Sequence, residues 1–196
     1  MADKTYTSDS IDVTYNVKRC IHAKECVRGL PQVFDTDKRP WIQPSEASPD
    51  ALAQVIERCP TGALHYQRKD NGPGETPDTI NTLQTVVDGP IYVRGHITFT
   101  ASDGTITKQD SRVALCRCGA SQNKPFCDNS HKSISFSAQD ALANNLDRSD
   151  NSLDGTGELT VSPSANGPLL LNGEFVLYSC DGEMSLAHVH SIYVLR

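Results

Sequence analysis

The sequence CRCGASQNKPFCDNSH, residues 116–131, places three cysteines and one histidine close together in a chain of 196 residues. Thiolate and imidazole ligands select zinc or an iron–sulfur cluster over hard cations. The intervening glycine, serine, asparagine and proline residues supply the turns that a tight ligand loop requires. The stretch therefore predicts a metal centre, and its four expected ligands are Cys116, Cys118, Cys127 and His131.

The composition of the chain limits the classes of protein to which it can belong. Hydrophobic residues make up 37%, and the net charge of −6 argues against general nucleic-acid binding. The N-terminus has no apolar signal segment, and no run approaches the about 20 apolar residues of a membrane span. We therefore expect a soluble, cytoplasmic protein with no membrane partner. In that compartment the seven cysteines are not expected to form disulfides, and their clustering favours metal.

Residues 1–68 have the pattern of a small α+β module. Residues 12–17 alternate as a strand does, and residues 62–66 read as a second strand. Between them, SPDALAQVIERCP predicts a helix that Ser48 caps and that ends before Pro60.

This first module contains a second cysteine set, formed by Cys20, Cys26 and Cys59. A [4Fe-4S] ferredoxin loop reads C-x2-C-x2-C with a distant Cys-Pro, but Ala23 stands at the middle position here. Three thiolates suit three irons of a [3Fe-4S] cluster, whereas a [4Fe-4S] cluster needs a fourth ligand, for which His22 is the nearest candidate. Three buried core cysteines are the alternative, since cysteine is a commonly buried residue.

Residues 69–79, KDNGPGETPDT, are rich in glycine, proline and charge and predict a linker. Beyond the linker, residues 89–118 align with residues 167–196 at a constant offset of 78 without a gap. The matches at turn positions are Gly89-Pro90 on Gly167-Pro168, Gly95 on Gly173, and Asp103-Gly104 on Asp181-Gly182.

Each copy of this repeat predicts three strands with an Asp-Gly hairpin. The second copy stops before the cysteine-rich stretch, so the repeat duplicates a β scaffold but not the metal site. We therefore expect a mostly-β module with the site in residues 80–140, a loop over residues 141–157, and a second β unit without ligands in residues 158–196.

The stretch from Cys116 to His131 resembles the motif of the CDGSH, or mitoNEET-like, iron–sulfur family, C-x-C-x2-[S/T]-x3-P-x-C-D-G-[S/A/T]-H. The one departure is Asn129, which stands where the family has glycine. Glycine there suggests a positive φ, which asparagine tolerates next best. The resemblance implies a [2Fe-2S] cluster held by the three cysteines and His131. An imidazole ligand would raise the reduction potential and couple the cluster to pH. On spacing alone, zinc remains the alternative.

The first module resembles the small divergent mono-cluster ferredoxin family through the segments CIHAKECVRGLPQVFDTDKRPWIQP and VIERCPTGALHY. This resemblance covers about a third of the chain. It implies a [3Fe-4S] or [4Fe-4S] cluster at Cys20, Cys26 and Cys59, with His22 as the additional candidate ligand.

No catalytic motif accompanies these sites: the sequence has no G-x-S-x-G, no H-E-x-x-H, no P-loop and no dinucleotide fingerprint. We therefore expect an α+β iron–sulfur protein for one-electron transfer to a redox partner protein, and not an enzyme. The alternatives are cluster transfer to an apo-acceptor, redox or pH sensing, and a zinc-bound structural module. Because the repeat could replace a dimer partner, a monomer is expected ahead of a homodimer.

Basic residues flank both predicted sites, although the protein as a whole is acidic. Such residues could steer an acidic redox partner and offset cluster charge. They are Lys18, Arg19, Lys24 and Arg28 at the first site and Arg117, Lys124 and Lys132 at the second.

Overall fold

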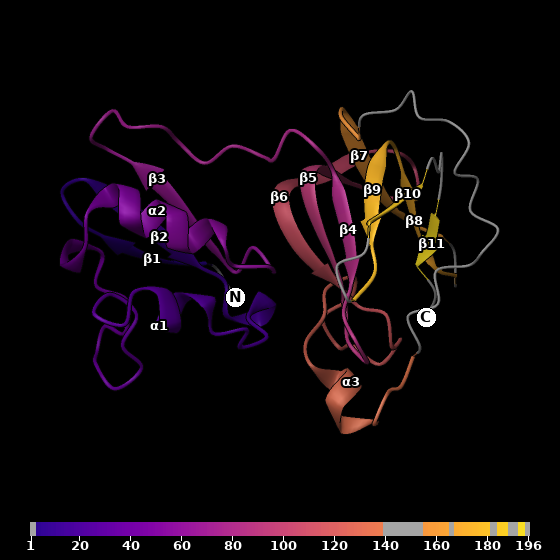
Figure 1. The fold of residues 1–196 in the computed structure, drawn as a ribbon, viewed down its shortest axis with the longest axis horizontal. Coiled ribbons are helices and arrows are strands. Elements are labelled where there is room, and N and C mark those ends of the chain that lie inside the picture. The colour runs from indigo at the N-terminus through magenta and orange to yellow at the C-terminus, as the bar shows by residue number, and fades with distance from the viewer. Residues whose placement is uncertain (1–2, 139–154, 165–166, 181–183, 188–191, 195–196) are drawn as a thin grey trace. The chain divides into compact units, whose positions relative to one another are not determined.

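The computed structural model describes residues 3–138, 155–164, 167–180, 184–187 and 192–194. The chain forms two compact units, Met1–Thr76 and Pro77–Arg196. The boundary between them falls inside the segment that the sequence predicts as a linker. The fold is α+β, with mostly strands and few short helices (Figure 1).

The first unit is a three-stranded antiparallel sheet with strand order β1-β2-β3, and α2 packs against it. The predicted first strand ends at Tyr15, because the chain turns there into a 3-10 helix. The elements are β1 (Lys4–Thr7), β2 (Ile11–Tyr15), η1 (Val17–Arg19), α1 (Glu25–Gly29), η2 (Pro44–Glu46), α2 (Pro49–Glu57) and β3 (Leu64–Arg68).

Helix α2 begins as the sequence predicts. The Ser48 hydroxyl accepts a hydrogen bond from the Ala51 amide at 3.3 Å, and Pro49 occupies the first turn. The helix buries Leu52 and Ile56 against the sheet. It is the longest helix in the described part of the chain, and none there is long and apolar enough to cross a bilayer.

The second unit is an eight-stranded sheet in which β5 is central and pairs with β4, β6 and β7. The path of strands is β10-β9-β4-β5-β7-β8-β11, with β6 off the path and paired with β5. The elements are β4 (Thr82–Thr85), β5 (Ile91–Thr100), β6 (Ile106–Leu115), α3 (Ser130–Ser133), β7 (Glu158–Pro163), β8 (Leu169–Asn172), β9 (Phe175–Tyr178), β10 (Met184–Ala187) and β11 (Ile192–Val194).

The pairing of strands repeats at the sequence offset of 78. Leu83 of β4 lies opposite Val93 of β5, and the corresponding Val161 of β7 lies opposite Leu171 of β8. The parallel pairings are exchanged between the two segments, because β4 pairs with β9 while β7 pairs with β5. As a result, each segment contributes strands to one shared sheet and one shared hydrophobic core.

The turns repeat in the same way. The Val86 amide donates to the Pro90 carbonyl at 3.0 Å, and the Ser164 amide donates to the Pro168 carbonyl at 3.1 Å. The matched glycines Gly95 and Gly173 have φ values of 126° and 137°, a region that side chains other than hydrogen rarely allow. The predicted match at Asp181-Gly182 lies outside the described residues.

Asn81 joins three segments of this sheet from a fully buried position. Its amide nitrogen donates to the Gly157 carbonyl at 3.0 Å and to the Glu174 carbonyl at 2.9 Å. Its amide oxygen accepts from the His96 amide at 2.9 Å. A Cβ at Gly95 would lie 2.0 Å from that oxygen, so the close approach depends on glycine. The residue therefore holds the start of β4 to β5, β7 and β9.

Replacing Asn81 with leucine should destabilise the second unit by about 2 kcal/mol or more, because three backbone groups lose a partner in a poorly hydrated position. The measurement is urea unfolding followed by far-ultraviolet circular dichroism. Fluorescence of Trp41, the single tryptophan of the chain, reports the first unit and should not change. Asn172→Leu, at an exposed position of the same sheet, is the control; equal effects of both variants would contradict the assigned role.

Candidate metal centres

The loop that carries the cysteine-rich stretch leaves β6 and returns against it before α3. The Cys116 amide donates to the Pro125 carbonyl at 2.9 Å, and the Cys127 amide donates to the Ala114 carbonyl at 2.8 Å. These bonds flank an antiparallel bridge between Leu115 and Phe126. The first and third cysteines of the motif are therefore held near each other, and both are buried.

The four predicted ligands come together as two pairs. Cys116 Sγ lies 3.8 Å from Cys118 Sγ, and Cys127 Sγ lies 3.4 Å from His131 Nδ1. A tetrahedral metal with bonds of about 2.3 Å to sulfur and about 2.0 Å to nitrogen separates two thiolates by about 3.8 Å and a thiolate from an imidazole by about 3.5 Å. Each pair therefore has the spacing of two ligands on one metal ion.

Two polar side chains fix the course of the loop. The Ser121 hydroxyl donates to the Phe126 carbonyl at 2.7 Å. The Asp128 carboxylate accepts from the amides of Gln122 at 2.8 Å and Ser130 at 2.9 Å. Burial alone would raise the pKa of Asp128, but hydrogen bonds from Ser130 and Gln122 lower it below its usual value. The carboxylate therefore stays charged at neutral pH.

Asn129 adopts the positive φ that the motif predicts, at 72°, immediately before the single turn of α3. This turn places His131 in a buried position. Burial first, and then the charge of Lys132, lowers the pKa of His131 below its ordinary value. The imidazole is therefore neutral at pH 7, which is the form that binds metal.

The buried position and mutual proximity of the thiols in this loop favour the binding of a cation. Burial raises the pKa values of Cys118 and Cys127, and the neighbouring Cys116 raises both further. Three thiolates this close repel one another unless a metal neutralises them. The donor set thus fits a metal or cluster that binds thiolates and releases their protons.

The first unit brings its three cysteines together from separate elements. Cys20 follows η1, Cys26 lies in α1, and Cys59 follows α2, and all three line one cavity of about 30 Å³. The pKa of Cys26 is raised to about 11, by burial and by the charges of Cys59 and Cys20. The tertiary structure therefore assembles the predicted set, although its members are distant in the sequence.

His22 has a different position from the three cysteines. It is exposed, has a φ of 59°, and lines a larger cavity of about 560 Å³ together with Cys20 and Cys26. Cys59 does not line that cavity. The imidazole therefore lies on the outer side of the cysteine set, beside two of its three members.

Sequence reasoning missed two residues that contact these cysteines. The Tyr15 hydroxyl is hydrogen-bonded to Cys20, and burial together with this bond raises the pKa of Tyr15. The ring of Tyr15 is held edge-on against Trp41, with the centroids 5.0 Å apart. The Thr61 hydroxyl lies 3.5 Å from Cys59 Sγ. Neither residue belongs to a ligand spacing pattern, so only the fold identifies them.

Two basic residues assigned to the flanking surfaces donate to backbone carbonyls, and for Arg19, which is buried, the surface assignment is wrong. Arg19 is buried and donates to the Thr61 carbonyl. Arg117 donates to the carbonyls of Val86 at 2.7 Å and Gly89 at 3.0 Å. Both guanidinium groups thus donate to backbone carbonyls, and the Val86 carbonyl also accepts from the Gly89 amide at 2.9 Å. The other basic residues assigned to the flanking surfaces are exposed: Lys18, Lys24, Arg28, Lys124 and Lys132.

Comparison with known proteins agrees with both sites. Residues 6–69 match a family model described as a divergent 4Fe-4S mono-cluster domain, and residues 88–132 match one described as an iron-binding zinc finger of the CDGSH type. The YjdI proteins of Escherichia coli K12 and O157:H7 are each 41% identical over 66 residues, which cover 34% of this chain and 87% of the relative. The chain belongs to the divergent mono-cluster iron–sulfur family and also carries a CDGSH domain. Both resemblances inferred from the sequence are thus confirmed.

The match to YjdI accounts for the mono-cluster domain alone, because it covers only about a third of the chain. Within the CDGSH domain, Asn129 keeps the backbone conformation that the glycine of the family motif suggests. This departure from the motif is therefore compatible with the ligand geometry.

Replacing Asn129 with valine should cost about 1–2 kcal/mol, since a β-branched residue is strained at positive φ. The strain falls next to His131, so iron should be lost faster from the CDGSH domain. Asn129→Gly restores the family residue and should retain iron at least as well as the wild type. The measurement is the rate of iron release to a chelator, and equal rates for both variants would contradict this role of the backbone.

Proposed function

We propose that this protein is a two-cluster iron–sulfur protein that transfers single electrons to and from a partner protein. The observation that carries the proposal is the paired spacing of Cys116 with Cys118 and of Cys127 with His131. A [2Fe-2S] cluster needs two ligands on each of two irons, and this arrangement supports it. When bound, the cluster supplies the redox chemistry, while the protein fixes its position and tunes its potential.

The same spacing disfavours a structural zinc site. A zinc ion requires four ligands directed at one point. In the part of the chain that the structure describes, no three Cys, His, Asp or Glu side chains are grouped to hold a single metal ion. Two separate pairs fit a bridged pair of irons better than one tetrahedral ion.

For the mono-cluster domain, we propose a cubane-type cluster at Cys20, Cys26 and Cys59. Each thiolate of such a cluster binds a different iron, which agrees with three cysteines around one cavity. Three ligands suffice for [3Fe-4S], and His22 supplies the fourth for [4Fe-4S]. The strained φ of His22, next to Cys20 and Cys26, supports a ligand role, because strain of this kind is often retained for function.

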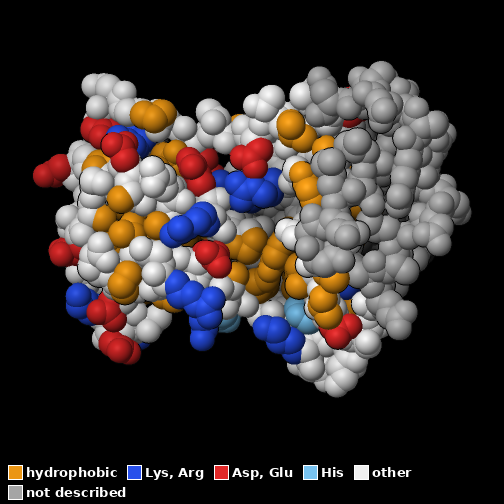
Figure 2. Space-filling model, viewed as in Figure 1, with side chains coloured by type: hydrophobic (Ala, Val, Ile, Leu, Met, Phe, Trp, Pro, Cys, Tyr) orange, Lys and Arg blue, Asp and Glu red, His pale blue; other side chains and the backbone are white. Residues whose placement is uncertain are grey.

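We propose a reducing, cytoplasmic setting and an acidic partner. None of the seven cysteines, all of which lie in the described ranges, forms a disulfide, which suits a reducing compartment. The exposed Lys24 and Arg28 near the first site and Lys124 and Lys132 near the second supply positive charge. Elsewhere the charges alternate: on the face in Figure 2, Lys and Arg are interspersed with Asp and Glu. Partner recognition would therefore be local and sensitive to ionic strength.

The repeated registers of the second unit support a duplicated β scaffold. The reciprocal pairing of β4 with β9 and of β7 with β5 lets two segments of one chain complete a single sheet. We propose that the second segment takes the place that a second subunit would have, so that the protein is a monomer.

The alternative function is cluster donation or pH sensing, and His131 is the observation that favours it. This ligand is carried by a helix of four residues, and a proton on its nitrogen would compete with iron. A cluster held in this way is easier to release than one held by four cysteines.

Anaerobically purified protein should contain iron and acid-labile sulfide and show two sets of electron paramagnetic resonance signals, in the oxidised or the dithionite-reduced state. Cys127→Ser should remove one set and Cys59→Ser the other. His22→Ala should convert a [4Fe-4S] signal into a [3Fe-4S] signal, and should leave a [3Fe-4S] signal unchanged.

Light scattering of the same sample should give the mass of one chain, 21.3 kDa.

Incubation with an apo-ferredoxin at mildly acidic pH separates the two functions. An electron carrier keeps its visible spectrum, whereas a cluster donor loses it to the acceptor. The rate at which a partner ferredoxin reduces this protein should fall at high salt, and it should also be lower for the Lys124→Gln variant. Zinc without iron or sulfide in replete material would disprove both functions.

Replacing His131 with cysteine should lower the midpoint potential of the CDGSH cluster, by on the order of 100 mV or more, because a thiolate adds negative charge. It should also remove the pH dependence of cluster retention. The wild type should lose its cluster faster as the pH falls from 8 to 5. The burial-lowered pKa of His131 keeps the imidazole neutral in the upper part of that range, and protonation in the lower part removes a ligand.

The measurement for this prediction is visible absorbance against time at each pH, together with a redox titration. His96→Cys, at an exposed histidine of the same unit, is the control and should behave as the wild type does. Identical pH profiles for the wild type and His131→Cys would show that His131 is not the acid-sensitive ligand.

A further inference from the structure

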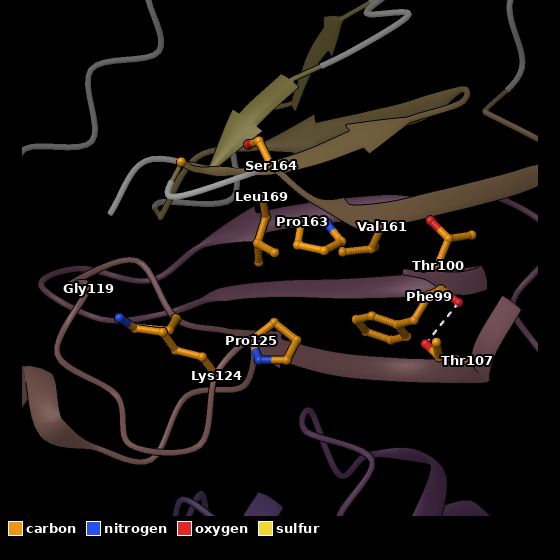
Figure 3. Close-up of a pocket in the computed structure, with 12 residues that line it drawn as sticks. Phe99, Thr100, Thr107, Gly119, Lys124, Pro125, Val161, Pro163, Ser164 and Leu169 are labelled. Carbon is orange, nitrogen blue, oxygen red and sulfur yellow. Dashed lines mark hydrogen bonds between the residues drawn. The ribbon is translucent and has the colours of Figure 1, made fainter. Parts of the chain in front are cut away.

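A cavity of about 280 Å³ lies beside the CDGSH ligand Cys116 (Figure 3). Its lining comes from β5, β6, the ligand loop, β7 and the turn into β8. A volume of this size is close to the lower end, about 300 Å³, of small-molecule pockets. The cavity can therefore take a ligand of one or two rings, but not a peptide or a dinucleotide.

Apolar side chains line this cavity from the sheet and from the ligand loop. Phe99 and Val161 are paired neighbours on β5 and β7, and Figure 3 shows Pro125 of the loop across from Pro163 and Leu169. The Phe99 ring is held edge-on by Phe126, with the centroids 5.5 Å apart. Opposed apolar walls with a fixed aromatic ring favour a flat, apolar ligand.

The polar groups at the walls are mostly engaged within the protein. The Thr107 hydroxyl donates to the Phe99 carbonyl at 3.2 Å, and the Ser164 hydroxyl donates to the Pro168 carbonyl. Such a wall offers few hydrogen bonds to a sugar or a polar metabolite. The lining therefore selects against strongly hydroxylated ligands.

Among the described residues that line the cavity, Lys124 alone carries a permanent charge. It is exposed, and Figure 3 shows its ammonium group at the open side of the cavity near Gly119. It makes no ion pair with another residue in the described ranges. A ligand anion at this end would gain an interaction without displacing an existing carboxylate.

We propose that this cavity binds a small planar aromatic molecule that carries an anionic group. The ring lies between Pro125 of the ligand loop and the sheet residues Val161 and Leu169, beside the Phe99 ring. The anion lies at the ammonium group of Lys124. Binding buries apolar ring surface, which supplies most of the affinity, and the ion pair orients the ring.

The cavity lies between the two β segments of the sheet. Val161, Pro163 and Leu169 belong to the second β segment, whereas Gly119, Lys124 and Pro125 belong to the ligand loop of the first. The site therefore arises where the loop of one segment covers the turn of the other.

Because Cys116 lines the cavity, a bound ring would lie against a ligand of the cluster. It would exclude water from that side, and the exposure of a cluster to solvent influences its potential. This effect on the cluster rests on the proposed function, whereas binding in the cavity does not depend on it.

The test is calorimetric titration of the iron-replete protein with 2-naphthoate and, separately, with neutral 2-naphthol. Both should bind saturably, with 2-naphthoate about fivefold to tenfold tighter, as expected for one partly exposed ion pair. In Lys124→Gln this preference should disappear, whereas Lys132→Gln, in an exposed residue that does not line the cavity, should retain it.

A second pair of variants tests the location. Leu169→Trp fills the cavity and should abolish binding of both compounds, whereas Leu170→Trp, whose side chain points to the other face of β8, should leave binding intact. Saturable binding should also shift the visible circular dichroism of the cluster.

Absence of saturable binding would overturn the proposal, as would unchanged binding in Leu169→Trp or a preference for 2-naphthoate that persists in Lys124→Gln. If Leu169→Trp fails to fold, the two lysine variants still decide the result, since both changes are at the surface. Iron and sulfide analysis of the same sample tests the clusters separately, so a failure of binding and a failure of the proposed function are distinguishable.

Discussion

The bridge that holds residues 114–116 to residues 125–127 is the constraint on which the rest of the CDGSH site depends. It brings Cys116 and Cys127 together, and it leaves a short loop for Cys118. Without it, thiols that repel each other when ionised would have no reason to stay close. Backbone hydrogen bonds therefore hold the cysteines close together. A bound cation would stabilise this arrangement further, because it displaces the thiol protons and neutralises the thiolates.

The sheet supports this bridge through an exchange of strands. Each β segment pairs its first strand with a later strand of the other, so neither segment can bury its apolar face alone. Asn81 joins β4 to three neighbours, with every polar atom of its side chain bonded. A buried amide satisfied in this way specifies one register over its alternatives. The cavity beside Cys116 lies where the ligand loop of the first segment meets β7 and β8 of the second.

The two metal centres differ in what assembles them. The CDGSH ligands lie in one loop, so local turns and one helical turn suffice. The mono-cluster cysteines come from η1, α1 and the end of α2, and their proximity depends on the packing of the whole first unit. Tyr15 and Thr61 contact this second set directly. Its cluster should consequently be the more sensitive of the two to changes in a distant core.

The sequence alone determined the α2 cap at Ser48, and the family motif that it resembles predicted the positive φ at Asn129, because each depends on residues within one turn of the chain. The donor set and the repeat are also predictions from the sequence, the latter because turns demand glycine at set positions. The tertiary structure decided which predicted ligands lie in pairs, the hydrogen bonds of Arg19 and Arg117 to backbone carbonyls, and the strand exchange. These depend on which distant carbonyls need donors and on which faces need cover, and contacts between distant segments leave no local pattern in the sequence.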